Sequence, residues 1–142
     1  MPPSAATTVR QLDRRVRVLI ADDHPGIRKM VRSTLQTHPH FEVCGEAING
    51  AEAIEKAEKL KPDVVVLNVS MPVLNGFEAA RGIKTILPES AIVILSSNAD
   101  QRFVEEAKKI GVRAYVAKSV AGEALVKAVE AAVIGGDFVL IQ

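Results

Sequence analysis

The sequence predicts an α/β protein in which one doubly wound, five-stranded parallel sheet forms a single domain. With 142 residues, of which 48% are hydrophobic and 25% are charged, the chain has the size and apolar content of one domain with its own core. From Val16 onward, apolar strand-like runs alternate with amphipathic helical stretches, which is typical of strand-helix units. The run Val64–Leu67 is apolar at successive positions, which indicates a strand covered on both faces in the middle of a parallel sheet.

Turn residues and helix breakers mark the first two strand-helix units. The first strand, Val16–Ala21, ends at an acidic pair, and the Pro25 that follows suits the first turn of a helix. The apolar residues of that helix share one face, namely Ile27, Met30, Val31 and Leu35. A second strand, Phe41–Ala47, leads through the turn Asn49-Gly50 to a helix that Lys61-Pro62 ends.

The remaining units repeat the scheme along the second half of the chain. They are the strand Val64–Leu67, a helix from about Gly76 to Leu87, the strand Ala91–Leu95, a helix from about Gln101 to Ile110, the strand Arg113–Val116 and a helix from about Ala121 to Ile134. Five units without a second pattern predict one domain over residues 16–136 with right-handed crossovers. The apolar run Phe138–Ile141 leaves two alternatives for residues 137–142: packing back onto the domain, or starting a linker.

Charge and cysteine content exclude several classes of function. The 18 basic and 17 acidic residues give a formal charge of +1, so no global positive field attracts nucleic acid or an anionic membrane. One cysteine cannot form an internal disulfide, and with three histidines it does not suffice for a Cys/His zinc site. No run approaches the roughly 20 apolar residues of a membrane span, and residues 1–15 resemble a flexible arm rather than a signal peptide. We therefore expect a soluble cytoplasmic protein without membrane contact.

Polar side chains follow the predicted strands at their carboxyl ends, where open parallel sheets bind ligands. They are Asp22 and Asp23 after the first strand, Asn68 after the third, Ser96 and Ser97 after the fourth, and Lys118 after the fifth. Adjacent carboxylates suit a divalent cation such as Mg²⁺, which prefers oxygen ligands, but they suit a helix cap before Pro25 equally well. Opposite the two aspartates, Lys118 suits an ion pair or a phosphate contact, whereas Ser96 alone is typical of a turn hydroxyl.

Four stretches together resemble the receiver domain of two-component response regulators, most closely its NarL-type branch, over about Val16–Gly136. The stretches are Val18–Pro25, Val66–Pro72 with Asn75-Gly76, Ile94–Ser97 and Ala114–Lys118. The resemblance implies a flavodoxin-like (βα)5 fold and a phosphorylation-controlled signalling switch that is not an enzyme. It also implies a sensor histidine kinase or phosphotransfer protein as partner, a homodimer, and a DNA-binding output domain outside this chain.

The resemblance assigns a role to each strand-end residue. Asp22 and Asp23 would be the metal carboxylates, with Asp23 the direct ligand, and the backbone carbonyl of Ser70 would be a further ligand. The phosphoryl-binding and switch positions would be Ser96, Ser97, Tyr115 and Lys118. Among these, the Ser96 hydroxyl would move toward the phosphoryl group and the Tyr115 rotamer would follow that movement.

Asn68 departs from the family pattern, because receivers carry the phosphate-accepting aspartate at this position. An amide is neutral and its lone pairs are delocalised, so no acyl phosphate can form there. The amide oxygen could still face Mg²⁺, but three aspartates and Lys118 would sum to −2, whereas the two aspartates present sum with Lys118 to −1. We therefore expect a receiver that is locked in the unphosphorylated state and binds Mg²⁺ weakly.

Alternatives to this interpretation remain open. Asn68 is either a substitution in an otherwise complete receiver or the mark of a natural pseudo-receiver that works through contacts alone. A magnesium-dependent phosphohydrolase is a rival, but such enzymes also use a strand-end aspartate as nucleophile. A nucleotide- or flavin-binding protein is disfavoured, because no glycine-rich loop follows the first strand and Asp22 with Asp23 would repel phosphate.

Overall fold

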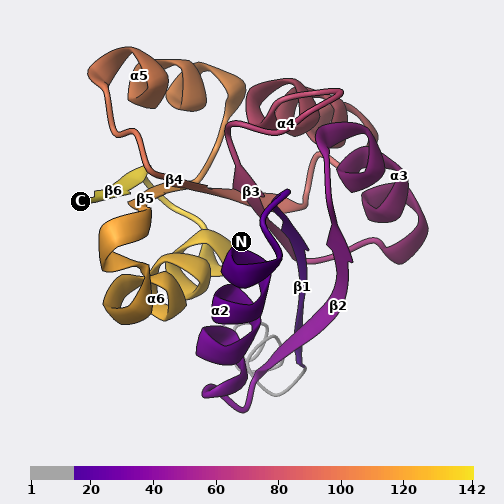
Figure 1. Ribbon diagram of the computed structural model, residues 1–142, viewed down its shortest axis with the longest axis vertical. Helices are drawn as coiled ribbons and strands as arrows, with labels where there is room; N and C mark the ends of the chain where they lie inside the picture. Colours follow the sequence, from indigo (N-terminus) through magenta and orange to yellow (C-terminus); the bar gives the residue numbers. More distant parts are fainter. Residues whose placement is uncertain (1–14) are drawn as a thin grey trace, which may run out of the picture.

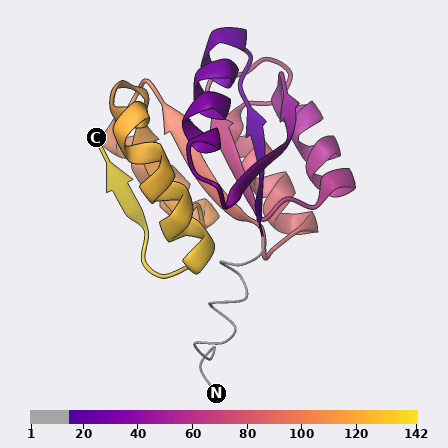
Figure 2. The same cartoon turned by 90° about the horizontal axis from the view of Figure 1, so that it is seen from below.

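The computed structural model describes residues 15–142, which form three layers with a parallel sheet in the middle. Helices α2 (Pro25–Gln36) and α6 (Ala121–Ile134) cover one face of the sheet. The other face carries α3 (Gly50–Leu60), α4 (Gly76–Ile86) and α5 (Gln101–Ile110), as Figures 1 and 2 show. The N-terminal arm expected over residues 1–15 lies, except for its last residue, outside the described part of the chain.

The strands follow the apolar runs of the sequence. They are β1 (Val16–Ala21), β2 (Phe41–Ala47), β3 (Val64–Asn68), β4 (Ala91–Ser96), β5 (Ala114–Ala117) and β6 (Val139–Ile141). A short 3-10 helix, η1 (Lys118–Val120), joins β5 to α6. The expected helices and the first five strands are confirmed, with ends that match the expected ones or differ from them by one or two residues.

All strands are parallel, in the order β2-β1-β3-β4-β5-β6. Because parallel strands end at the same edge, the residues that follow β1, β3, β4 and β5 come together there. The strand order reverses between β1 and β3, and this reversal is the point where doubly wound sheets bind ligands. The fold therefore places Asp22 and Asp23 next to Asn68.

The core lies in two apolar layers, one on each side of the sheet. All five residues of β3 are buried, which confirms the central position that its continuous apolar run predicts. One layer packs against α3, α4 and α5, and the other packs against α2 and α6. Because these layers fix the positions of the central strands, the loops that leave their carboxyl ends rest on a rigid support.

Side-chain caps begin three of the helices. Asn49 accepts the backbone N–H of Glu52 at the start of α3, and Asn75 forms a reciprocal capping box with Glu78 at the start of α4. Asp100 accepts the N–H of Arg102 at the start of α5. No helix within residues 15–142 is long and apolar enough to cross a membrane.

The sheet has six strands where the sequence predicts five. Gly135 and Gly136 have φ values of +89° and +116°, a left-handed backbone that suits glycine, and they turn the chain back after α6. The following residues form β6, which pairs with β5 in the register Tyr115↔Leu140. These residues therefore pack onto the domain in this structure. The physical reason is apolar burial, since Phe138 packs on one core layer while Val139 and Ile141 pack on the other.

Candidate functional site

An acidic loop joins β1 to α2 at the carboxyl edge of the sheet. The ligand atoms of Asp22, Asp23 and His24 lie within 4.8 Å of one another. His24 Nδ1 lies 3.4 Å from Oδ1 of Asp22 and 3.3 Å from Oδ1 of Asp23. The backbone N–H of His24 donates to Oδ1 of Asp22 at 2.9 Å, whereas no side chain caps α2. Neither aspartate is the N-cap of α2, so of the two interpretations of the pair the cation site is the one that the geometry favours.

Asp22 is a buried carboxylate that faces Lys118. Its side chain is only 3% exposed, and the Lys118 ammonium lies 3.3 Å from Oδ2. This contact is an ion pair without hydrogen-bond geometry, since Oδ2 has no hydrogen-bond partner among the described residues. A buried carboxylate oxygen with a free lone pair is ready to accept a further cation or donor.

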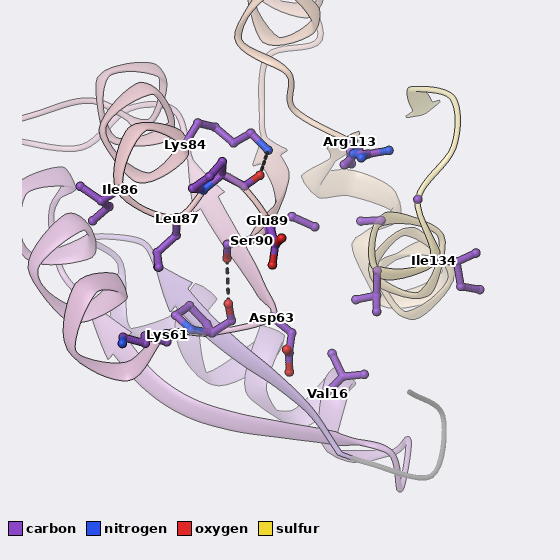
Figure 3. Close-up of a pocket in the computed structure, with 16 residues that line it drawn as sticks. Val16, Lys61, Asp63, Lys84, Ile86, Leu87, Glu89, Ser90, Arg113 and Ile134 are labelled. Atoms are coloured by element: carbon purple, nitrogen blue, oxygen red, sulfur yellow. Dashed lines mark hydrogen bonds between the residues drawn. The ribbon is translucent and has the colours of Figure 1, made fainter. Parts of the chain in front are cut away.

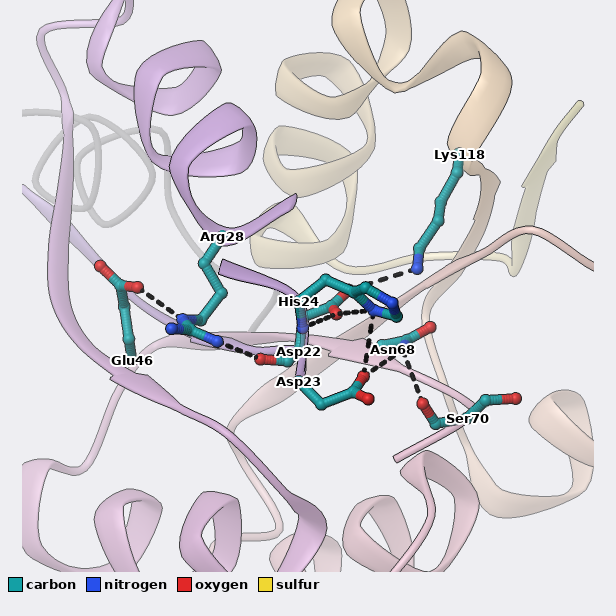
Figure 4. Close-up of polar contacts among 8 residues, drawn as sticks. All are labelled: Asp22, Asp23, His24, Arg28, Glu46, Asn68, Ser70 and Lys118. Atoms are coloured by element: carbon teal, nitrogen blue, oxygen red, sulfur yellow. Dashed lines mark hydrogen bonds and ion pairs between the residues drawn. The ribbon is translucent and has the colours of Figure 1, made fainter. Parts of the chain in front are cut away.

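The Asn68 amide bridges two oxygens that would otherwise face each other (Figure 4). Its Nδ2 donates to the carbonyl oxygen of Ser70 at 2.8 Å and to Oδ1 of Asp23 at 3.4 Å. The Asn68 residue is 4% exposed, so these bonds form largely away from water. Asn68 therefore supplies two N–H donors at the position where the family resemblance expects a negatively charged acceptor.

The loop between β3 and α4 approaches Asn68 closely. A Cβ atom on Gly76 would lie 2.1 Å from the backbone oxygen of Asn68, so only glycine fits there. The Gly76 N–H donates to the carbonyl of Val69 at 2.7 Å. Val73 has a φ of +70°, and the Leu74 N–H donates to the Pro72 carbonyl at 2.8 Å, which makes a strained γ-turn around Val73. The sequence pattern did not indicate this close contact at Gly76.

Ser96 and Tyr115 meet at the backbone of Asn98. The Ser96 hydroxyl donates to the Asn98 carbonyl and accepts the Asn98 N–H, both at 3.0 Å, and the Tyr115 hydroxyl donates to the same carbonyl. Tyr115 is fully buried, and burial raises the pKa of its phenol above 10.0. Ser97 is exposed at the surface beside Ser96. The hydroxyls of this group are thus engaged with the loop after β4.

Arg28 supports the acidic loop from helix α2, a role that sequence reasoning missed. Its Nη1 donates to the backbone carbonyl of Asp22 at 2.8 Å, and its Nε donates to Glu46 on β2 at 3.0 Å. Arg32 donates to the same carboxylate at 2.8 Å. Burial raises the pKa of Glu46, but the hydrogen bonds from Arg32 and Arg28 outweigh it and leave the pKa below 4.5.

The oxygens of this pocket are the ligand type that Mg²⁺ prefers. They include Oδ2 of Asp22, which has no hydrogen bond among the described residues, Oδ1 of Asp23 and the carbonyl of Ser70. The donor set therefore fits a hard divalent cation. The Asn68 amide group competes for two of these oxygens, because its N–H groups point at Asp23 and Ser70. A cation that used both would require the amide to turn and expose its oxygen.

A hollow of about 910 Å³ opens at the opposite, amino-terminal edge of the sheet (Figure 3). Several of its polar groups are bonded to nearby backbone, since Ser90 Oγ donates to Pro62 and Lys84 Nζ donates to Pro88. Lys84 has a lowered pKa because of burial and the nearby charge of Arg113. The strand-end residues identified in the sequence lie at the other edge, so the hollow is separate from the acidic pocket.

Comparison with known proteins identifies the family of this fold and pocket. Residues 18–130 match the response regulator receiver domain family. The chain belongs to this family. Receiver domains are signalling modules of two-component systems, bind Mg²⁺ at an acidic pocket and interact with histidine kinases and phosphotransfer partners. The acidic cluster Asp22-Asp23-His24 lies at the corresponding edge of the sheet in this receiver domain.

Individual relatives agree with this assignment. The chain is 32% identical to the transcriptional regulatory protein DegU of Brevibacillus brevis over 127 residues, which cover 89% of this chain and 54% of that protein. It is 41% identical to the chemotaxis protein CheY of Thermotoga maritima over 102 residues, which cover 72% of this chain and 84% of CheY. The receiver spans about half the length of several transcriptional regulators that it matches, including 58% of YhcZ of Bacillus subtilis.

Solved receiver structures share the fold. The signal receiver domain of the response regulator NarL from Mycobacterium tuberculosis superimposes with a TM-score of 0.82 at 31% identity, covering 87% of this chain and 99% of that one. The non-phosphorylated receiver domain of RcsB from Escherichia coli superimposes with a TM-score of 0.82 at 26% identity, covering 91% of this chain and 100% of that one. The flavodoxin-like fold expected from the sequence is confirmed.

Proposed function

We propose that this chain is a receiver domain of the NarL-type branch that stays unphosphorylated because Asn68 occupies the acceptor position. The observation that carries the proposal is the hydrogen bonding of the Asn68 amide, which donates to Asp23 and to the Ser70 carbonyl. A phosphorylated receiver needs a carboxylate oxygen to attack phosphorus, and an amide in this position offers N–H groups instead. The domain then rests in the unphosphorylated state.

Weak Mg²⁺ binding follows from the same contacts. A cation at this pocket would be held by Asp22, Asp23 and the Ser70 carbonyl, with Asn68 contributing its amide oxygen after the amide turns. When bound, Mg²⁺ would neutralise the acidic pair and polarise a phosphoryl donor. Rotating the Asn68 amide breaks both of its hydrogen bonds. The neutral amide also adds no charge to attract the cation. Both effects lower the affinity for the cation.

The switch positions are proposed to keep the family roles. Lys118 would bind phosphoryl oxygens and in their absence pairs with Asp22 at 3.3 Å. Ser96 would leave the Asn98 backbone to reach a phosphoryl group, with Ser97 beside it in the same loop. Tyr115, buried and bonded to the Asn98 carbonyl, would change its rotamer when Ser96 moves.

The partners are proposed from the family. We expect a sensor histidine kinase or phosphotransfer protein, a second copy of the receiver, and a DNA-binding output domain beyond this chain, all in the cytoplasm. The proposed divisions are an arm over residues 1–15, the receiver over 16–136 and an extension or start of a linker over 137–142, within which Val139–Ile141 form β6. The proximity of Asp22, Asp23 and Lys118 favours a substitution at Asn68 in a working receiver over a natural pseudo-receiver or a phosphohydrolase, because a receiver that never used its pocket would not need to retain them.

The test compares the chain with Asn68→Asp in the presence of acetyl phosphate and Mg²⁺, read by intact-mass spectrometry. We expect a gain of one phosphoryl group in Asn68→Asp and none in the parent chain. A second variant, Asn68→Asp with Asp23→Asn, controls for the cation and should lose most of the uptake. Equal labelling of parent and Asn68→Asp would refute the proposal by showing another acceptor, and labelling of neither would favour a module that works by contacts alone.

A further inference from the structure

The two edges of the sheet differ in how they are protected from pairing with another strand. The edge strand β2 carries the charged residues Glu42 and Glu46, and an irregularity in its register with β1 lies between Val18 and Leu19. Charges and bulges on an edge strand discourage pairing with a further strand. The opposite edge strand, β6, consists of Val139, Leu140 and Ile141 and has neither feature.

The backbone of Leu140 is the part of β6 that faces away from the sheet. In a parallel strand both backbone groups of one residue point to the same side, and successive residues alternate between sides. The Val139 N–H donates to the Arg113 carbonyl at 3.0 Å, so Val139 and Ile141 face β5. The N–H and carbonyl of Leu140 therefore point outward, where no strand of residues 15–142 lies (Figure 1).

The side chain of Leu140 is exposed as well. It is 41% exposed, whereas Val139 and Ile141 pack on the core layer formed with α6. An exposed leucine on an uncharged edge strand gives a partner both an apolar contact and a free pair of backbone hydrogen-bonding groups. The polar residues Asp137 and Gln142 lie only at the two ends of this segment.

We propose that β6 is a self-association surface, through which two copies of this receiver pair their β6 strands antiparallel about a two-fold axis at Leu140. In an antiparallel pair, opposite residues whose backbone groups face each other exchange both N–H to carbonyl bonds. The dyad places Leu140 of each copy opposite Leu140 of the other, so the two outward pairs of groups satisfy one another. The Leu140 side chains then lie on the same face of the joined sheet and cover each other.

A second copy fits this edge better than an unrelated strand because every contact is self-complementary. With Leu140 on the axis, Val139 lies opposite Ile141 and Phe138 opposite Gln142, so no two like charges face each other across the pair. A two-fold axis also closes the assembly at two copies, since each β6 edge is used once. The inference is independent of Asn68 and of the acidic pocket, which lies at the carboxyl ends of the strands.

Sedimentation equilibrium of the 142-residue chain tests the surface. We expect reversible dimerisation from 15.2 kDa to twice that mass, with a dissociation constant on the order of 100 µM because the contact is small. Leu140→Pro removes the outward N–H and leaves the bonds of β6 to β5 intact, so it should weaken dimerisation at least tenfold. The matched control Leu140→Ile keeps both the N–H and an apolar side chain, and should dimerise like the parent. A monomer at all concentrations, or an unchanged dimer in Leu140→Pro, would overturn the proposal.

Crosslinking locates the axis without depending on the stability of Leu140→Pro. In a Cys44→Ser background, Leu140→Cys places two thiols directly opposite each other, within the Cα separation that disulfides require. Mild oxidation should therefore give a covalent dimer for Leu140→Cys. The control Val73→Cys, at a 75% exposed position in the loop between β3 and α4, should give no more dimer than random collision. Equal crosslinking of the two variants would place the contact elsewhere and refute the dyad at Leu140.

Discussion

Replacing Asn68 with aspartate exchanges a hydrogen-bond donor for a charged acceptor at an unchanged position. In the parent chain Nδ2 of Asn68 lies 3.4 Å from Oδ1 of Asp23 and 2.8 Å from the Ser70 carbonyl. A carboxylate oxygen there turns both attractions into repulsions. Without a cation, we therefore expect Asn68→Asp to be less stable than the parent.

The magnitude follows from the distance and the exposure of the two groups. Two unit charges 3.4 Å apart repel by about 5 kcal/mol at an effective dielectric constant of about 20, and by about 1 kcal/mol in bulk water. The Asp23 side chain is 32% exposed and Asn68 is 4% exposed, so an intermediate value applies. With the lost hydrogen bond to Ser70, we expect a decrease of about 2–3 kcal/mol in the free energy of unfolding.

The assay is urea unfolding followed by far-UV circular dichroism, with EDTA or with Mg²⁺. A cation that binds only the folded state at about ten times its dissociation constant stabilises by about 1.4 kcal/mol, so Mg²⁺ should recover much of the deficit in Asn68→Asp. The parent should gain less. The control Asn98→Asp makes the same chemical change, and its new carboxylate can still accept the N–H of Asp100 at 2.8 Å, so Mg²⁺ should not affect it. Equal stability of parent and Asn68→Asp in EDTA, or equal stabilisation of both by Mg²⁺, would refute the reasoning.

Three further variants test individual contacts by equilibrium unfolding. Lys118→Met leaves the buried Asp22 carboxylate without the ammonium that faces it, so the free energy of unfolding should fall by about 3 kcal/mol. Adding Asp22→Asn should restore part of this loss. Additive effects of the two changes would show that the pair is not coupled. Gly76→Ala puts a Cβ atom against a backbone oxygen and should lower the free energy of unfolding by about 3 kcal/mol. The control Gly122→Ala has no atom within 4 Å of the new Cβ and should raise the free energy of unfolding by about 1 kcal/mol. Similar shifts for both variants would contradict the assigned clash. Glu46→Gln should cost about 1 kcal/mol at neutral pH. Because folding lowers the pKa of Glu46, the stabilisation that its carboxylate provides is complete above pH 4.5 and disappears as the pH falls through the pKa of the folded state. If Glu46→Gln destabilised the protein equally in acid and at neutral pH, the two arginine bonds would not be the source of the effect.

The order of strands and helices was predictable because the spacing of apolar residues indicates which segments are buried. Val64–Leu67 is apolar at every position, and the structure buries all of β3 in the middle of the sheet. Because parallel strands end together, strand prediction alone brought Asp22 and Asn68 to one edge. The family resemblance then supplied the expectation of a charged acceptor and made Asn68 conspicuous.

Details that depend on side-chain direction could not be predicted. Sequence spacing places Asn68 at the end of a strand, but whether its amide presents N–H or oxygen to Asp23 depends on one torsion angle. Arg28 lies on a surface helix, and arginine side chains on surface helices mostly face water. Nothing in the sequence around Arg28 therefore indicated its bond to the Asp22 carbonyl. A three-residue apolar run such as β6 is too short for periodicity to separate a sheet strand from the start of a linker.

The carbonyl oxygen of Asn98 is a common acceptor for hydroxyls from two different strands. Ser96, at the end of β4, and Tyr115, in β5, both donate to it. If one hydroxyl leaves this oxygen, the other no longer shares it, so the positions of Ser96 and Tyr115 are coupled through one backbone atom. A change at the end of β4 can thus act directly on the neighbouring strand β5 through this shared acceptor.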